Sequence, residues 1–329
     1  MKYIETNWDI PFYNMAFEEY VINHMPEDDY VFFYIHKPSI IVGKHQNTIE
    51  EINKDYVDRN QIHVARRLSG GGAVYHDSGN LNFSFIVQAE AKDVNNFKKF
   101  TLPVIKALEK MGVQSELTGR NDITIDGKKF SGNAQYFRRK KLLHHGTMLF
   151  NSQMSNLADA LQVKELKIKS KGIKSVRSRV TNIIDHLEDK KLSILDFKKY
   201  LLECMSQENN IEKYILTESD KAAVKASVDK KFGTWEWNWG ESPAFELQKI
   251  DKFDCGIIDA RMNIKEGIIK DIKIFGDFFV RKEIEVLEDQ LRYCQYRKEM
   301  IAEKLLKMNI EDFFHGLKKE QFIHLLCEQ

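Results

Sequence analysis

The chain of 329 residues has few cysteines and no long apolar run, and both absences exclude classes of protein. Its four cysteines lie far apart and form no C-x-x-C pair, so we expect reduced thiols packed as small apolar residues rather than a disulfide framework. The longest apolar neighbourhood, residues 30–43, is interrupted by His36, Lys37 and Pro38. It is too short and too polar to span a membrane, and it predicts two strands instead. The cysteines are Cys204, Cys255, Cys294 and Cys327.

The chain also lacks a charge bias, because 50 basic and 49 acidic residues leave a formal charge of +1. This balance does not favour nucleic-acid binding. The first seven residues lack the apolar core of a signal peptide, so we expect a cytoplasmic protein. The length exceeds that of one typical domain and predicts a larger unit, residues 1–247, followed by a smaller one, residues 248–329. We expect a monomer.

Neither of the common phosphate-binding signatures is present, since the chain has no P-loop and no G-x-G-x-x-G fingerprint. Instead, Arg66 and Arg67 lead into Leu68, Ser69 and three consecutive glycines, residues 70–72. Glycine amides in a turn form a concave, partly positive nest, and arginine adds a planar fork of donors that suits phosphate or carboxylate. The pattern predicts an anion or nucleotide site, and a plain β-turn that requires positive φ is the alternative.

A second cluster lies in residues 118–133, where Asp126-Gly127 between alternating apolar residues predicts a two-residue hairpin. The hairpin pairs residue 124 with 129, 123 with 130 and 122 with 131, which puts Asp122, Lys129 and Ser131 on one face. A lysine there would hold a carboxylate and stabilise negative charge during acyl transfer. A solvated hairpin is the alternative, and a loop longer by one residue would present Lys128 instead of Lys129.

Strand-like and helix-like segments alternate along the chain and predict an α+β fold with a mixed β-sheet flanked by helices. The predicted helix at 49–59 follows the cap residues Asn47-Thr48, and another has Pro103 in its first turn and ends at Gly112. Three tryptophans alternate in residues 234–240 and predict a core strand. Beyond Pro243 the pattern predicts a second, smaller α+β unit. Further strands are expected at 30–35, 40–42, 81–87, 142–150, 255–264 and 268–275, and further helices at 12–25, 283–292, 297–307 and 320–326.

Two further segments carry candidate functional groups. His144 and His145 lie in the predicted strand 142–150 without the other ligands that a zinc site requires, which favours structural or substrate-shaping histidines. Residues 164–179 carry seven basic residues and one acid. This basic loop is interpreted either as a solvated segment or as a flap over a phosphate-bearing intermediate.

Taken together, several ordered motifs resemble the lipoate–protein ligase A family, within the biotin/lipoate protein ligase superfamily. The likeness covers nearly the whole chain, including the Trp-x-Trp-Asn stretch and a small C-terminal domain. The motifs that carry it are R-R-x-S-G-G-G-A-V-Y-H-D at 66–77, G-R-N-D at 119–122, G-K-K-F-S-G at 127–132, H-G-T at 145–147 and K-G-I-K-S-V-R-S-R-V at 171–180.

The resemblance implies a cytoplasmic enzyme that uses ATP and Mg²⁺ to convert lipoate into lipoyl-adenylate. A lysine of an acceptor lipoyl domain, on a dehydrogenase E2 subunit or the glycine-cleavage H protein, then takes the acyl group. It implies Lys129 as the catalytic contact to carbonyl and phosphate, and Asp122 as a weak Mg²⁺ ligand. By the same resemblance the adenylate contacts are Arg67, Gly71, Gly72, Ala73, Val74, Tyr75, Asn121, Asp122, Lys129, Arg177 and Arg179, and the lipoate contacts are Lys129, Ser69, Gly70, His76 and His145.

Other functions are weighed against this one. A lipoyl or octanoyl transferase of the same superfamily works without ATP through an enzyme thioester, and it needs a cysteine thiolate near a positive group. No cysteine precedes Cys204 and none lies in the motifs, which disfavours that mechanism. Biotin ligation calls for a different basic glycine-rich run. A noncatalytic lipoyl-binding protein is disfavoured because Arg67, the glycines and Lys129 are all present.

Overall fold

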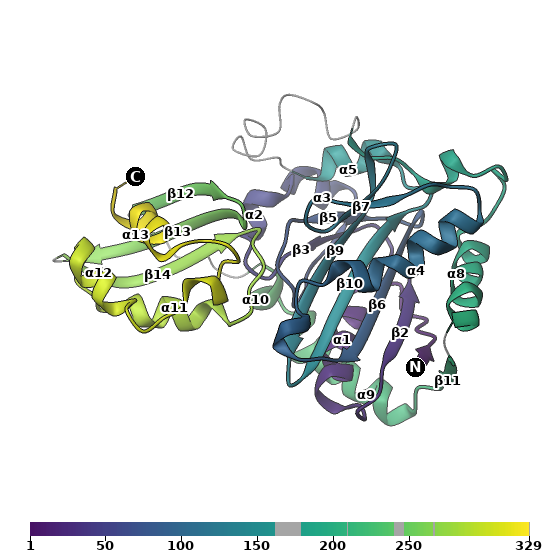
Figure 1. The fold of residues 1–329 in the computed structure, drawn as a ribbon, viewed down its shortest axis with the longest axis horizontal. Helices are drawn as coiled ribbons and strands as arrows, with labels where there is room; N and C mark the ends of the chain where they lie inside the picture. The colour runs from purple at the N-terminus through teal and green to yellow at the C-terminus, as the bar shows by residue number, and fades with distance from the viewer. Residues whose placement is uncertain (162–178, 209, 240–246, 266, 329) are drawn as a thin grey trace.

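The computed structural model describes residues 1–161, 179–208, 210–239, 247–265 and 267–328, which form two α+β units (Figure 1). The larger unit contains an eight-stranded sheet in the order β11-β1-β2-β6-β10-β9-β8-β7. Strand β1 pairs in parallel with both its neighbours, whereas the remaining pairs are antiparallel. The predicted α+β class with a mixed sheet is confirmed. The strands are β1 (Lys2–Ile4), β2 (Tyr30–Tyr34), β6 (Asn80–Gln88), β7 (Glu116–Thr118), β8 (Asp122–Ile125), β9 (Lys128–Arg138), β10 (Lys141–Leu149) and β11 (Glu212–Tyr214).

A second sheet of three short strands lies in the same unit, with β3 (Ser39–Val42) between β4 (His63–Arg66) and β5 (Val74–His76). The chain between β4 and β5 is the Arg-Arg-Gly motif, so this sheet holds both ends of the glycine turn. None of the helices in the described part of the chain has the length and apolar character that a bilayer crossing needs. The helices of this unit are α1 (Pro11–His24), α2 (Thr48–Glu51), α3 (Lys54–Arg59), α4 (Phe97–Lys110), α5 (Met154–Ala160), α8 (Ile194–Glu208), α9 (Glu218–Ser227) and α10 (Trp235–Asn238).

Strand β2 shows why the large sheet is covered on both faces. Its five residues are all apolar or aromatic and all buried, as expected for a strand with helices on both sides. Val31 and Phe33 face the core that contains Val104 of α4 and Phe197 of α8. The alternate residues of β2 face a second core that contains Phe17 of α1 and Val224 of α9.

The hairpin that carries Lys129 forms as predicted at its turn and departs from prediction further along. Asp126 and Gly127 adopt positive φ of 50° and 72°, as a type I′ turn requires, and Thr124 lies opposite Lys129. Beyond that pair a bulge shifts the register, so Ile123 faces Ser131 and Asp122 faces Gly132. The bulge keeps the apolar residues buried, because Ile123, Ile125 and Phe130 still share one core.

Two predicted helices have different bounds in the structure. The predicted helix 49–59 is two helices, because Ile52 pairs with Leu161 and the Asn53 side chain accepts a hydrogen bond from Tyr56 N, which starts α3 afresh. Helix α4 begins six residues before Pro103 rather than at it, capped by Asn96, whose side chain accepts from Lys99 N. Burial of the helix face that contains Phe100 and Val104 outweighs the hydrogen bond that the proline removes.

The prediction of a core strand at 234–240 was wrong in the residues that the structure describes. Residues 235–238 form the short helix α10, in which the Thr234 side chain accepts from Trp237 N. Trp235 is 49% exposed, so it does not belong to a core. Trp237 instead donates its Nε1–H to Arg66 O at 2.9 Å. A threonine before the first tryptophan is a helix-cap signal that competes with the two-residue alternation.

The smaller unit is an antiparallel sheet covered by helices, and its predicted strands and helices all form. Strand β13 (Gly256–Lys265) pairs with β12 (Leu247–Phe253) on one side and with β14 (Ile268–Gly276) on the other. The helices are α11 (Ile284–Leu291), α12 (Lys298–Lys304) and α13 (Lys319–Glu328). The strand at 247–253 was not predicted, and the proposed boundary at residue 247 stays a prediction.

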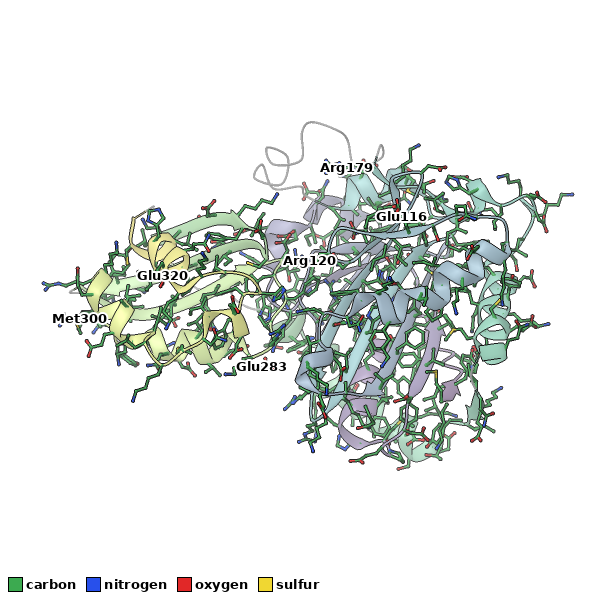
Figure 2. The ribbon with its side chains drawn as sticks, viewed as in Figure 1. Glu116, Arg120, Arg179, Glu283, Met300 and Glu320 are labelled. Atoms are coloured by element: carbon green, nitrogen blue, oxygen red, sulfur yellow. The ribbon has the colours of Figure 1, made fainter. Side chains whose placement is uncertain are left out.

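The segment after β14 connects the two units. Gly276 N donates to His45 O at 2.7 Å, and Gly71 N donates to Phe278 O at 3.3 Å. The ring of Phe278 stacks on His45, with centroids 5.1 Å apart. Ion pairs between Lys44 and Glu283 and between Arg261 and Glu50 add to this contact. Figure 2 shows Arg120 and Glu283 where the two units meet. The smaller unit therefore lies directly against the glycine turn.

Candidate active site

One cavity brings together most of the residues that the sequence singled out. It lies between the glycine turn, helix α1 and strands β9 and β10. Its predicted members are Arg67, Gly71, Gly72, Ala73, Val74, His76, Asn121, Lys129 and His145. The remaining lining residues are Met15, Tyr34, Ile41, Asn82, Gly132, Asn133, Ala134, Gly146, Thr147 and Phe279.

Arg67 shapes the glycine turn from within. Its Nη2 donates to Gly70 O at 2.7 Å and to Gly72 O at 2.9 Å, and its Nε donates to Ser69 Oγ at 3.0 Å. Burial lowers the pKa of Arg67 to about 10, so the guanidinium remains a cation at neutral pH. Gly71 has a φ of +94°, and a Cβ there would lie 2.9 Å from both Arg67 and Phe279. The turn therefore needs glycine, and it carries a buried positive charge beneath its backbone.

Arg66 binds backbone outside the glycine turn. Its guanidinium donates to the carbonyl oxygens of Gly43, Lys44 and Gln46 at 2.7–3.0 Å. Its Nε also donates to Trp237 O at 2.9 Å. These contacts tie α10 and the loop after β3 to the strand that leads into the turn. Arg66 is thus a structural residue, in keeping with its absence from the cavity.

Lys129 projects from the hairpin toward Asp122, as predicted. Its Nζ lies 2.7 Å from Asp122 Oδ1, and the two side chains are 37% and 35% exposed. Gly132, three residues further along β9, packs closely against the lysine, because a Cβ there would lie 2.8 Å from Lys129 Nζ. Thr181 N donates to Lys129 O at 3.0 Å, so the segment that follows the basic loop joins the strand here. Lys129 is held in place while its ammonium stays accessible.

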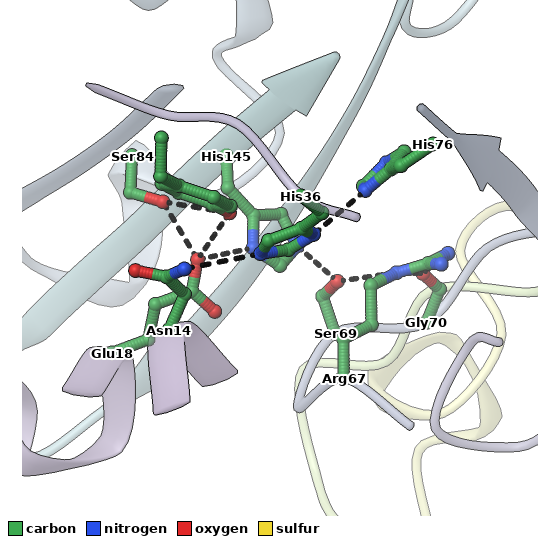
Figure 3. A network of polar contacts seen from close by, with 10 residues as sticks. Asn14, Glu18, His36, Arg67, Ser69, Gly70, His76, Ser84 and His145 are labelled. Carbon is green, nitrogen blue, oxygen red and sulfur yellow. Dashed lines mark hydrogen bonds and ion pairs between the residues drawn. The ribbon is translucent and has the colours of Figure 1, made fainter. Parts of the chain in front are cut away.

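Two cavity residues, Tyr34 and His145, contact the fully buried Glu18, which the sequence analysis missed. Its Oε1 accepts hydrogen bonds from Ser84 Oγ at 2.6 Å and Tyr34 OH at 3.3 Å, and it lies 2.8 Å from His145 Nδ1. The other nitrogen of His145 lies 2.6 Å from Ser69 Oγ. Figure 3 shows this chain of contacts leading on to Arg67. A glutamate in a predicted helix looks solvent-exposed in sequence, and only the tertiary fold shows that it is buried.

Some predicted residues lie beside the cavity rather than in it. Ser69 is buried between Arg67 and His145, and the side chain of Tyr75 packs with Ile40 and Val42. Gly70 accepts from Arg67 and sits against Phe278. Asp122 contacts Lys129 but does not line the cavity, and neither does Arg179. Arg177 lies outside the described residues.

Phe279 is a cavity residue that comes from the smaller unit. The guanidinium of Arg120 lies over its ring, 4.5 Å from the centroid, and Arg120 Nη1 also donates to Cys255 O at 2.5 Å. A pair of phenylalanines after a predicted strand, Phe278 and Phe279, carries no sequence signal for a site. The two units thus complete one cavity.

The arrangement suits a substrate that has a charged head and an apolar tail. Lys129, Asn121 and the glycine turn supply a cation and polar groups, whereas Met15, Tyr34 and Ile41, each at most 4% exposed, supply largely apolar surface to the same cavity. Such a mixed polar and apolar cavity in an α+β fold is typical of a small-molecule binding site or active site.

Comparison with known proteins identifies the family. The model described as lipoyl protein ligase A/B catalytic domain matches residues 10–206, and the one described as bacterial lipoate protein ligase C-terminus matches residues 242–326. The chain is 47% identical to lipoate-protein ligase LplJ of Bacillus subtilis, over 97% of this chain and 98% of the relative. The protein therefore belongs to the lipoyl protein ligase A/B family, as its motifs predicted.

Solved structures agree with this assignment. A bipartite lipoate protein ligase from Thermoplasma acidophilum, studied with its E2 lipoyl domain, is 30% identical with a TM-score of 0.66, over 75% of this chain and 98% of that chain. A lipoate-protein ligase A bound with ATP is 28% identical with a TM-score of 0.64, over 73% of this chain and 98% of that chain.

Proposed function

We propose that this protein activates lipoate with ATP and then transfers the lipoyl group to a lysine of an acceptor lipoyl domain. One observation carries the proposal: a single cavity is lined both by Lys129 and the glycine turn and by buried apolar side chains such as Met15 and Ile41. A lipoate molecule has the matching form, with a carboxylate at one end of an apolar chain and a ring at the other. The named relatives support the same substrates.

The chemistry follows from what each group supplies. A carboxylate is a poor acyl donor, and joining it to AMP provides a good leaving group. Lys129 stabilises the negative charge on the acyl and phosphate oxygens as a point charge, since its ammonium is not a nucleophile. Asn121 and the backbone of residues 71–75 orient the adenylate from the other side. Arg67 acts through the turn that it holds, because most of its donors already bind carbonyl oxygens.

The acyl tail is proposed to lie between Tyr34, His76 and His145. Ser69 and Gly70 act indirectly there, through His145 and Arg67. Residues Arg177 and Arg179 are proposed to cover the adenylate. We also propose residues 1–247 as the catalytic unit and 248–329 as an accessory unit that contributes Phe279.

Mg²⁺ is proposed as the companion of ATP. Within the described residues no three histidine, cysteine or acidic side chains cluster in a way that would hold a metal ion. Mg²⁺ usually takes one or two carboxylates together with substrate phosphates, so Asp122 with the phosphate oxygens fits such a site. The bound ion would screen phosphate charge, and Asp122 would then divide its oxygens between the ion and Lys129.

The transferase alternative requires an accessible thiolate near the cavity. All four cysteines lie in the described ranges, and none of them lines the cavity. Cys255 is the one linked to a cavity neighbour, through its backbone carbonyl and Arg120. Burial raises the pKa of the Cys255 thiol to about 11, which keeps it protonated. The ligase mechanism is therefore favoured over covalent transfer.

The test mixes the full chain with lipoate, ATP and Mg²⁺, with and without an isolated lipoyl domain. We expect pyrophosphate release that depends on lipoate, and a lipoyl domain whose lysine gains one lipoyl group by mass spectrometry. Lipoylation that proceeds without ATP, or an acyl-cysteine adduct on this chain, would instead support the transferase. If pyrophosphate is released but no lipoyl domain is modified, the activation step would stand and only the assignment of the acceptor would be refuted.

A further inference from the structure

Two buried histidines form a direct ring-to-ring contact behind the cavity. His36 Nδ1 and His76 Nδ1 lie 3.0 Å apart, and the residues are 1% and 3% exposed. On its far side His36 Nε2 lies 3.1 Å from Asn14 Nδ2. Figure 3 shows the three side chains in line. His76 lines the cavity, whereas His36 and Asn14 do not.

Asn14 sets the direction of this chain of hydrogen bonds. Its Nδ2 also lies 2.8 Å from Trp8 O, which can only accept, so the Asn14 atom that faces both partners must be the NH₂ group. Asn14 therefore donates to His36 Nε2. A neutral imidazole whose Nε2 accepts carries its proton on Nδ1, so His36 donates in turn to His76 Nδ1.

The proton of His76 then lies on its remaining nitrogen. Burial lowers the pKa of both histidines, that of His36 to about 3, so both rings are neutral. His76 Nε2 is buried and has no hydrogen-bond partner among the described residues. A buried N–H without a partner is unfavourable, and it indicates a group that awaits an acceptor from a ligand.

The place of His76 in the cavity shows which part of a ligand it meets. His76 pairs with Ser39 in the sheet that also carries Ile41, and its partner His36 lies against Tyr34 with ring centroids 4.9 Å apart. Tyr34 and Ile41 belong to the buried core that also contains the cavity residue Met15. His76 therefore lies in the part of the wall that Tyr34 and Ile41 also line, and its unpaired N–H is a polar donor beside those side chains.

We propose that Asn14 and His36 act as positioning residues that hold His76 with its proton on Nε2, so that this N–H selects acyl tails that carry an acceptor near their distal end. The proposal rests on the proposed function, which supplies an acyl substrate. The dithiolane sulfurs of lipoate are weak acceptors that pair with such a donor, whereas a saturated chain such as octanoate leaves the N–H unpaired. This chain of hydrogen bonds from Asn14 through His36 to His76 thus favours lipoate over unsubstituted fatty acids.

The direct test is the tautomer itself. We label the full chain with ¹⁵N-histidine and record long-range ¹H–¹⁵N correlations, with the His76 and His36 rings assigned from the signals lost in His76→Phe and His36→Phe. The expected spectrum has the proton on Nε2 in His76 and on Nδ1 in His36. A proton on His76 Nδ1 in the wild-type chain would overturn the proposal, and this measurement needs no variant to be active.

The functional test compares pyrophosphate release with lipoate and with octanoate. In His76→Phe, which removes the donor, we expect the lipoate-to-octanoate ratio of kcat/KM to fall about fivefold, mostly through a higher KM for lipoate. Asn14→Leu removes the donor that fixes the proton of His36 on Nδ1, so it should lower the ratio while His76 remains. His45→Phe is the matched control, because this buried histidine also has an Nε2 without a partner among the described residues, packs on Phe278 and does not line the cavity.

The outcomes separate this proposal from the proposed function. An unchanged ratio in folded His76→Phe would refute selection by the N–H, even if lipoate is activated normally. An equal loss in His45→Phe would show that any buried histidine produces the effect, which would also refute the proposal. Failure of the wild-type chain to activate either acid would instead refute the proposed function, whereas the tautomers would still be read from the spectrum.

Discussion

Replacing Lys129 by alanine should remove activity while leaving the fold intact. The Lys129–Asp122 pair has an Nζ–Oδ1 distance of 2.7 Å, but both side chains are more than a third exposed. Partly exposed ion pairs contribute about 0–1 kcal/mol to stability, so we expect Tm to fall by no more than about 3 °C. Loss of a group that stabilises transition-state charge lowers kcat by roughly 10²–10³-fold.

Lysine 128 offers a matched control, because it is the adjacent residue in the same hairpin and its side chain is exposed. The assay is lipoate-dependent pyrophosphate release by Lys129→Ala, Lys128→Ala and the wild-type chain, with thermal melting of each. Lys128→Ala should keep nearly full activity. Wild-type rates in folded Lys129→Ala, or equal losses in both variants, would refute the role of Lys129 and the register that places it in the cavity.

Three further predictions follow from the same structure. Gly132→Ala would place its Cβ 2.8 Å from Lys129 Nζ and so displace the ammonium group, which is the flexible end of its side chain. Activity should therefore fall about tenfold in the assay above, while Tm stays within a few degrees. Glu18→Leu removes the acceptor that binds Ser84, Tyr34 and His145, and urea unfolding should show a loss of about 1–3 kcal/mol in the free energy of unfolding, with no loss arguing against a buried network. Burial lowers the folded-state pKa of His36 and His45 to about 3, so below pH 6.5 these histidines bind protons only in the unfolded chain. As the pH falls from 6 to 4, each should therefore lower the free energy of unfolding by about 1.4 kcal/mol per pH unit. A free energy of unfolding that does not change with pH in urea titrations would contradict this.

The parts of the site that the sequence could predict are those encoded by local signals. The Asp126-Gly127 turn identifies the hairpin. The hairpin directs the side chain of Lys129 toward Asp122, even though a bulge lies between Ile123 and Thr124. The three glycines after Arg67 identify the turn that lines the cavity. In both cases a few adjacent residues determine the backbone, so spacing alone is informative.

The parts that could not be predicted depend on contacts between distant segments. Glu18 and His145 are 127 residues apart, and no local pattern shows that a helix glutamate is buried beneath a strand histidine. Phe279 reaches the cavity only because the smaller unit lies against the glycine turn. Helix α10 was misread because alternating tryptophans resemble a strand, whereas the cap at Thr234 and the contacts to Arg66 decide the structure.

The central claim is that one cavity binds the acyl nucleotide between Lys129 and the glycine turn, with the acyl tail toward Tyr34. The most direct measurement is a crystal structure of the full chain with a stable analogue of lipoyl-adenylate. We predict a phosphate or sulfamate oxygen within hydrogen-bond distance of Lys129 Nζ, and the dithiolane ring beside His76. An analogue bound elsewhere, with Lys129 in open solvent, would contradict the account.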